Sequence, residues 1–267
     1  MDFSDYKDYY LIKCFSNEKY REDFNSGKNI HLNSCKYFHK VENNFQKDME
    51  GVIINQDENQ DGYLIVPHID IKQLLNDYNA GLVSKDINIM QTILCNSEII
   101  CGTKNFIDYI NGYLCCFYII KKSQIIFKDS EIHFPNENDY NNFFFFLNEY
   151  SNNGYAYISV YDAETLLSTL CSELHSKEYD FTNGFVQYKN LSEKEKINMF
   201  KEKNIYKIVF TKNEIFKYQK EFRIFLTPKN GIVSEFIEEK ICPLSNSIVN
   251  NFVYLSPDFC IEKGIKK

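Results

Sequence analysis

The chain has 267 residues, a formal net charge of −7 at pH 7, and 44% hydrophobic against 25% charged residues. This balance is that of a globular protein and excludes a disordered chain. The negative charge argues against nucleic acid as a partner, because neutralising phosphates supplies much of the affinity of nucleic-acid-binding proteins. No repeat and no Pro- or Gly-rich linker divides the chain, so we expect a single domain over residues 1–267.

The first predicted elements are a strand over residues 9–15 and a short helix that follows it. Ser16 or Asn17 can cap this helix at its start, and Gly27 stands where a left-handed C-cap belongs. Alternating apolar residues then predict a strand at residues 30–32.

The middle of the chain contains a loop, two helices and a buried strand. Residues 40–62 are polar and rich in Asn, which predicts a loop, and residues 69–78 have helical spacing. The continuous apolar run at residues 113–120 predicts a buried central strand. Four consecutive Phe residues place aromatic rings on every side of a helix over residues 139–150, so we expect this helix to be buried all round.

The later part of the chain mixes helices and strands. Apolar spacing predicts a helix over residues 163–174, and a capping box opens another over residues 192–203. Residues 205–217 fit either a helix or a strand. The remaining predicted strands lie at residues 63–66, 155–160, 185–188, 222–227, 233–237 and 248–255. Because no regular βαβ alternation occurs, we expect an α+β fold of mainly antiparallel mixed sheets with flanking helices.

The nine cysteines are odd in number, and several lie in apolar runs, as at residues 114–117. This pattern is typical of thiols in a reducing compartment rather than of a disulfide framework. No cysteine lies near a histidine at a zinc-ligand spacing, so no metal is expected. Neither a signal sequence nor an apolar run of membrane-spanning length is visible, so we expect a cytoplasmic protein without a membrane partner.

Motifs of several large enzyme classes are absent. The chain contains no GxGxxG, no GxxxxGK[ST], no GxSxG and no HExxH, so doubly wound nucleotide folds and P-loop enzymes are not expected. Residues 57–62 match the first half of an EF-hand calcium loop, but its twelfth position is His68 instead of a bidentate Glu. A turn between strands is the simpler interpretation.

The most informative stretch runs from Tyr218 to Leu226. In a strand, alternation would place Gln219, Glu221 and Arg223 on one polar face, opposite an apolar face. Arg223 is one of only two arginines in a chain that otherwise uses lysine, which suggests a need for a planar donor. Two interpretations remain open, a half-solvated strand with a Glu–Arg neighbour pair and a functional site.

The order Q-x-E at the start of this strand resembles the signature of mono-ADP-ribosyltransferases of the R-S-E clade. The resemblance implies that Glu221 binds the ribose 2′-OH of NAD and stabilises the oxocarbenium-like species as nicotinamide leaves. It also implies that Gln219 faces the acceptor nucleophile. The family's first-strand arginine would fall near Lys13, and its Ser-Thr-Ser strand has at best Ser159.

A second resemblance covers roughly two-thirds of the chain through short motifs. In chain order these are Cys14-Phe15, Glu18–Phe24, Gly27, Leu32–Ser34, Tyr37-Phe38, Asp48–Gly51, Gly184–Tyr188 and Tyr218–Arg223. Together they look like an uncharacterised family of bacterial and phage proteins related to abortive-infection proteins of the AbiGi type. The resemblance implies a setting, which is conflict between phage and host.

The first functional hypothesis is an ADP-ribosyltransferase-like, NAD-acting enzyme in phage defence or counter-defence. Its catalytic residues would be Glu221, Gln219 and Arg223, and its substrate-binding residues would be Tyr37, Asp48, Glu50 and Tyr218. One of the two tyrosines would stack on the nicotinamide, and the two carboxylates would line the same cleft.

The alternative hypothesis is a non-catalytic binding module that engages a host or phage protein or a nucleotide signal. The high content of Tyr and Asn suits adaptable, amphipathic contact surfaces. A cleft without a perturbed carboxylate would favour this hypothesis over the enzyme.

Overall fold

The computed structural model describes part of the chain. The described residues are 2–35, 37, 63–67, 98–102, 111–128, 131–150, 155–191, 195, 204–230, 233–255 and 265–266. The predicted loop at 40–62, the predicted helix at 69–78 and most of the predicted helix at 192–203 lie outside these ranges.

Internal contacts group the chain into two compact units. The first contains Met1–Ser34, Gly112–Val186 and Ile215–Lys267, and the second contains Cys35–Asn111 and Gln187–Glu214. The organisation of residues 1–267 as a single domain stays a prediction.

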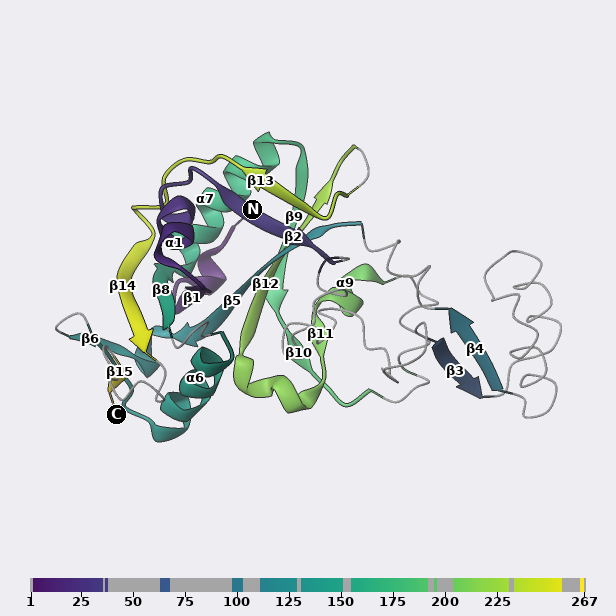
Figure 1. The fold of residues 1–267 in the computed structure, drawn as a ribbon, viewed down its shortest axis with the longest axis horizontal. Helices are drawn as coiled ribbons and strands as arrows, with labels where there is room; N and C mark the ends of the chain where they lie inside the picture. Colours follow the sequence, from purple (N-terminus) through teal and green to yellow (C-terminus); the bar gives the residue numbers. More distant parts are fainter. Residues whose placement is uncertain are drawn as a thin grey trace. The chain divides into compact units, whose positions relative to one another are not determined.

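The first unit is built on an eight-stranded sheet whose strand pairs are all antiparallel (Figure 1). Six strands follow one another across it in the order β9 (Tyr179–Phe185), β12 (Glu221–Pro228), β5 (Tyr113–Lys121), β1 (Tyr9–Phe15), β8 (Tyr155–Asp162) and β14 (Ile248–Leu255). Beside the start of β5, the sheet continues through β2 (Ile30–Ser34) and β13 (Phe236–Glu239). The predicted α+β class with a mainly antiparallel sheet is confirmed.

Shorter elements complete the two units. In the first unit, β6 (Ile126–Lys128), β7 (Glu131–His133) and β15 (Ile265–Lys266) form a three-stranded sheet, and η1 (Ser4–Tyr6) and η2 (Lys122–Gln124) are 3-10 turns. In the second unit, β3 (Tyr63–Pro67) pairs with β4 (Glu98–Gly102), β10 (Gln187–Tyr188) pairs with β11 (Thr211–Lys212), and α9 spans Ile205–Val209. A 3-10 helix, η3 (Glu214–Gln219), begins at the last residue of the second unit.

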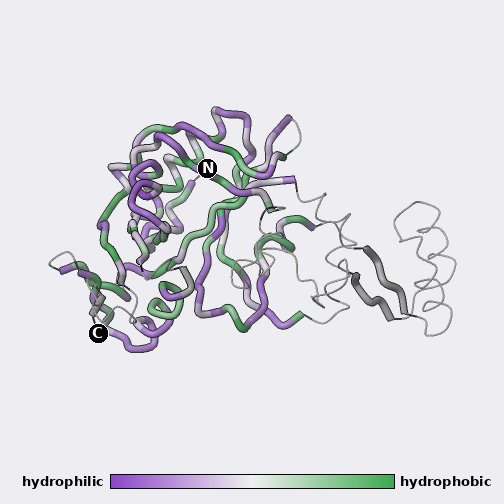
Figure 2. The backbone as a smooth tube through the Cα atoms, in the orientation of Figure 1, coloured by the Kyte–Doolittle hydropathy of each residue, from purple (hydrophilic) through white to green (hydrophobic). Residues whose placement is uncertain are grey.

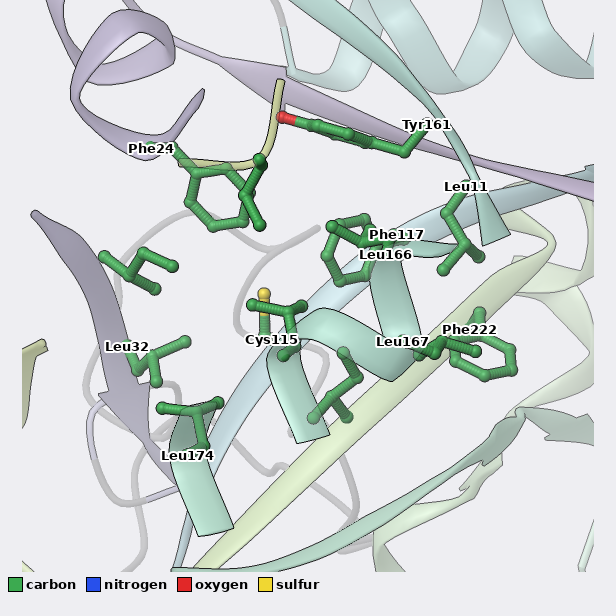
Figure 3. Close-up of a cluster of buried hydrophobic side chains, with 14 of the residues drawn as sticks. Leu11, Phe24, Leu32, Cys115, Phe117, Tyr161, Leu166, Leu167, Leu174 and Phe222 are labelled. Atoms are coloured by element: carbon green, nitrogen blue, oxygen red, sulfur yellow. The ribbon is translucent and has the colours of Figure 1, made fainter. Parts of the chain in front are cut away.

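One face of the main sheet is covered by α1 (Glu18–Asn25) and α7 (Ala163–Ser176). Figure 3 shows leucines of α7 packed with aromatic rings from β5 and β12. The fully buried residues of α7 include Leu166, Leu167, Leu170 and Leu174, which confirms the predicted apolar stripe. Figure 2 shows the matching hydrophobic run along β5, whose predicted burial is also confirmed.

The other face is covered by α6 (Glu137–Tyr150), which carries the four consecutive Phe residues. Phe143 and Phe146 are buried against this face, whereas Phe145 is 59% exposed. The prediction that the helix is buried all round is therefore wrong. Successive helical residues point about 100° apart, so a helix that covers one face of a sheet cannot bury four consecutive side chains.

The helix ends follow capping rules that the sequence already indicates. The side chain of Asn17 accepts a hydrogen bond from the Tyr20 N–H at 2.9 Å and so caps α1. Gly27 follows α1 with φ of 67°, the left-handed C-cap conformation that the sequence predicts. Among the described residues, no helix is long and apolar enough to cross a membrane.

Asp162 holds the start of α7 and ties it to η2. Its Oδ1 accepts the Thr165 N–H at 3.0 Å, and its Oδ2 lies 2.5 Å from Lys122 Nζ. Burial alone would raise the pKa of Asp162, but the hydrogen bonds from Lys122 and Thr165 lower it overall.

Replacing Asp162 is expected to weaken α7. We expect Asp162→Ala to lower the free energy of unfolding by about 1–2 kcal/mol at pH 7, measured by urea denaturation. Because the folded pKa lies below the ordinary value of 3.8, the part of this contribution that depends on the carboxylate charge is present above that pH and is lost as the pH falls through the lowered pKa. The difference from wild type should therefore shrink in acid, and a difference that stays constant would contradict the assignment.

Candidate functional site

The stretch singled out in the sequence forms the junction between η3 and β12. Gln219 ends η3, so it does not lie on the strand, and the predicted alternation from Gln219 to Glu221 is wrong. Lys220 lies between them with φ of 40°, a conformation in which non-glycine residues are strained. The Lys220 carbonyl accepts the Ile119 N–H at 2.9 Å, and Lys220 Nζ lies 2.7 Å from Asp139 Oδ1. These contacts hold the turn that sends the chain into the sheet.

Glu221 and Arg223 form an ion pair inside the sheet. Arg223 Nε donates to Glu221 Oε2 at 2.9 Å, and Arg223 Nη2 lies 2.8 Å from the same oxygen. Their side chains are fully buried, because β12 lies between β5 and β9 and both of its faces are covered. The predicted Glu–Arg neighbour pair is confirmed, and the prediction that its strand is half-solvated is wrong.

Tyr118 lies beside this pair, since it is the partner of Glu221 in the pairing of β5 with β12. Its ring packs on Phe143 and Phe146 of α6, with centroid distances of 5.1 and 4.7 Å. Its hydroxyl is buried and has no hydrogen-bond partner among the described residues. Burial raises the pKa of Tyr118, and the negative charge of Asp139 raises it further.

Removing this hydroxyl is expected to stabilise the protein. A buried polar group without a partner costs about 1–3 kcal/mol, so we expect Tyr118→Phe to raise the free energy of unfolding by about 1 kcal/mol. Tyr161→Phe is the matched control, because the Tyr161 hydroxyl donates to Asn25 Oδ1 at 2.5 Å and its loss should destabilise. Urea denaturation measures both, and a clear loss of stability in Tyr118→Phe would show that its hydroxyl is bonded.

Lys13 and Ser159, which the transferase resemblance also names, lie on the face of the sheet opposite to Glu221. Glu221 pairs with Tyr118, and Tyr118 pairs with Ile12, so these three side chains share a face. Lys13 follows Ile12 and points the other way, where it lies opposite Ser159 of β8. The sheet therefore separates Glu221 from both Lys13 and Ser159.

Lys13 and Ser159 each have internal contacts on their own face. Lys13 Nζ lies 4.9 Å from the ring centre of Phe117 and 3.4 Å from Cys115 Sγ, which is a cation–π setting. Burial raises the pKa of Cys115, although the charge of Lys13 opposes this shift. The Ser159 hydroxyl donates to Asn251 Oδ1 at 2.6 Å and so ties β8 to β14. Both residues therefore serve the packing of this face.

The predicted substrate-binding residues belong to different parts of the chain. Tyr218 lies in η3 and is half-buried, with its ring edge-on to Phe145 of α6 at a centroid distance of 6.5 Å. Tyr37 belongs to the second unit. Asp48 and Glu50 lie outside the described residues.

An open cleft of about 540 Å³ lies elsewhere in the first unit, between α7 and the start of β9. Its lining residues are Phe3, Ser168, Cys171, Ser172, His175, Asp180 and Phe181. The lining therefore combines two aromatic rings with hydroxyl groups, an imidazole and a carboxylate. Such a lining can hold the apolar part of a ligand and form hydrogen bonds with its polar groups.

Sequence reasoning missed this cleft because it used only the apolar stripe of α7. Ser168, Ser172 and His175 recur at helical spacing on the side away from the leucines, and this polar stripe is the signal that could have found it. The cleft adjoins the α7 face of the sheet, whereas the Glu221–Arg223 pair lies on the α6 face.

Two further observations bear on the chemistry. Within the part of the chain that the structure describes, no group of three or more His, Cys, Asp or Glu side chains could hold a metal ion. No protein-family model, no curated protein and no solved structure matches this chain.

Proposed function

We propose that this protein is a binding module in the conflict between phage and host, and that it engages a partner protein without turning over a substrate. The observation that carries the proposal is the buried ion pair in β12. Glu221 is bonded to Arg223 and fully buried, on the face of the sheet opposite to Lys13 and Ser159. A carboxylate held in this way neutralises an internal charge.

Two separate observations support the phage–host setting and the binding mode of action. The setting is supported by the resemblance to AbiGi-type proteins, which spans motifs from Cys14 to Arg223. The mode of action is supported by the geometry, in which the open cleft and the Glu221–Arg223 pair belong to different faces of the sheet.

A second candidate is an NAD-acting, ADP-ribosyltransferase-like enzyme, and one observation favours it. The strained Lys220 lies between the buried side chains of Gln219 and Glu221, and the buried Tyr118 hydroxyl beside them has no partner among the described residues. Strained residues and unsatisfied polar groups are enriched at active sites. NAD would be the substrate in that case.

Nicotinamide release separates the two candidates. Purified wild-type protein and Glu221→Gln are incubated with NAD and bacterial lysate, beside lysate alone. We expect no release above the lysate control from either protein, because the Glu221 carboxylate is buried and bound to Arg223. Release by the wild type that disappears in a normally folded Glu221→Gln protein would replace the binding module with the enzyme.

A further inference from the structure

The outer edge of β9 has no strand beside it in the described part of the chain. Within the described chain, β9 pairs only with β12. The Val186 N–H donates to the Glu221 carbonyl at 3.0 Å, and the Lys229 N–H donates to the Glu178 carbonyl at 2.9 Å. Because antiparallel pairs alternate along a ladder, the even-numbered residues between these two bonds exchange hydrogen bonds with β12. The odd-numbered residues therefore direct their N–H and C=O groups away from the sheet.

The outward-directed residues are Tyr179, Phe181, Asn183 and Phe185. None of their backbone N–H groups has a partner among the described residues. The sequence of β9 contains neither lysine nor proline, and its register with β12 shows no bulge. Natural proteins guard free edges with such features or with charged side chains, and the charge that β9 carries is Asp180 near its start, so the remaining edge from Phe181 to Phe185 indicates a surface that is covered in function.

The open cleft flanks this edge. Phe181 and Asp180 belong both to β9 and to the cleft lining, and the opposite wall is α7. A strand added to an edge directs alternate side chains to the two faces of the sheet. Those on the α7 face would enter the cleft over Phe181, within reach of Ser168 and Ser172. At the other end of β9, the ring of Phe185 is 43% exposed and offers a second apolar contact.

The start of β9 carries two carboxylates beside two lysines, of which Lys177 already lies 3.2 Å from Glu239 Oε2 and Lys229 lies opposite Glu178. Glu178 and Asp180 are exposed, and the described residues that line the cleft include neither lysine nor arginine. A partner strand with basic side chains would complement these carboxylates. A second copy of this chain would instead bring a net charge of −7 and a second Asp180 to the same edge.

We infer that β9 binds an extended, lysine- or arginine-bearing peptide segment of a partner protein, which adds to the main sheet as a further strand. Backbone hydrogen bonds to the odd-numbered residues give the affinity, and the cleft and the two carboxylates select the side chains. The inference rests on the proposed function and names the chemistry of the partner.

The test uses fluorescence anisotropy with three labelled octapeptides, each capped at both ends. One alternates lysine and valine, one alternates glutamate and valine, and one has the lysine composition with a proline at its centre. We expect binding of the first alone, because the second repels Glu178 and Asp180 and the third lacks a central N–H group.

A matched pair of protein variants tests the edge itself. Asn183→Pro removes an outward N–H group without breaking the ladder to β12, since edge positions of this kind tolerate proline. Asn183→Thr keeps the N–H group and is the control. We expect Asn183→Pro to weaken binding of the lysine peptide by about tenfold or more, and Asn183→Thr to bind like wild type. Asp180→Asn should weaken it severalfold and reduce its dependence on salt.

Several results would overturn the inference. Equal binding of the proline-interrupted peptide, or undiminished binding by Asn183→Pro, would mean that charge alone attracts the peptide. Concentration-dependent dimers that Asn183→Pro abolishes would make a second copy the occupant. If no peptide binds, the edge of β9 is not a peptide site. The proposed function has a separate test, because it would be contradicted by release of nicotinamide that depends on Glu221.

Discussion

Glu221→Gln is expected to destabilise the protein by about 3 kcal/mol, because removing one partner of a buried ion pair leaves the other charge uncompensated. The pair is fully buried, with Arg223 Nε 2.9 Å from Glu221 Oε2. Glutamine keeps the shape of the side chain but not its charge. Urea denaturation at pH 7 measures the loss. A functional carboxylate held in a solvent-filled site would instead tolerate this change with little effect on stability.

The second arginine of the chain supplies the control. Arg21 Nη2 lies 2.8 Å from Glu18 Oε1, and the Glu18 side chain is 55% exposed. Exposed pairs contribute about 0–1 kcal/mol, so Glu18→Gln should change stability by less than about 1 kcal/mol. The same substitution at the same interatomic distance then compares an exposed carboxylate with a buried one. Equal effects at Glu18 and Glu221 would contradict the assignment of an internal pair.

A double variant separates the charge from the packing. Glu221→Leu with Arg223→Met removes both charges and keeps apolar volume, and such replacements are often neutral or stabilising. We therefore expect the double variant to be more stable than Glu221→Gln alone. A larger loss in the double variant would mean that the two side chains are needed for hydrogen bonds to other groups.

Gly27→Ala is expected to cost about 2–4 kcal/mol, for two reasons that add. Gly27 has φ of 67°, a conformation that alanine adopts only with strain. A Cβ atom there would lie 2.6 Å from the Cys242 carbonyl oxygen, which is backbone and cannot turn aside. The same segment donates the Ile241 N–H to the Gly27 carbonyl at 2.9 Å, so relief of the clash would break this bond.

The neighbouring residue gives the comparison for this prediction. Ser26 is exposed and lies in the right-handed helical region with φ of −76°, so Ser26→Ala should change stability by less than about 1 kcal/mol. Gly27→Asn separates the two causes, because Asn tolerates the left-handed conformation but still carries a Cβ atom. A mild effect of Gly27→Asn would show that the close approach to Cys242 is relieved at low cost.

Elements with strong local signals could be predicted from the sequence. The apolar run at 113–120 became β5, the leucine stripe at 163–174 became α7, and the run at 248–255 became β14. In each case, the pattern that predicts the element lies within the element itself. The Glu–Arg neighbour relation also follows from local alternation, since both residues lie in β12.

Features that depend on distant residues could not be predicted. The sequence Tyr-Asp-Phe-Thr-Asn-Gly-Phe of β9 has the Asn-Gly and Asp of a turn, and its pairing with β12 overrides this preference. The burial of Glu221 depends on β5 and β9, which come from other parts of the chain. The end of η3 at Gln219 depends on contacts such as that between Lys220 and Asp139, far apart in sequence.

Native-state amide exchange along β9 tests the open edge most directly. We expect the amides of Phe181 and Asn183 to exchange at least about 100-fold faster than those of Thr182 and Gly184, because only the latter pair bonds to β12. This alternation would establish the free edge on which partner binding is proposed. Uniform slow exchange along β9 would mean that another segment already covers this edge, and it would contradict the proposed mode of binding.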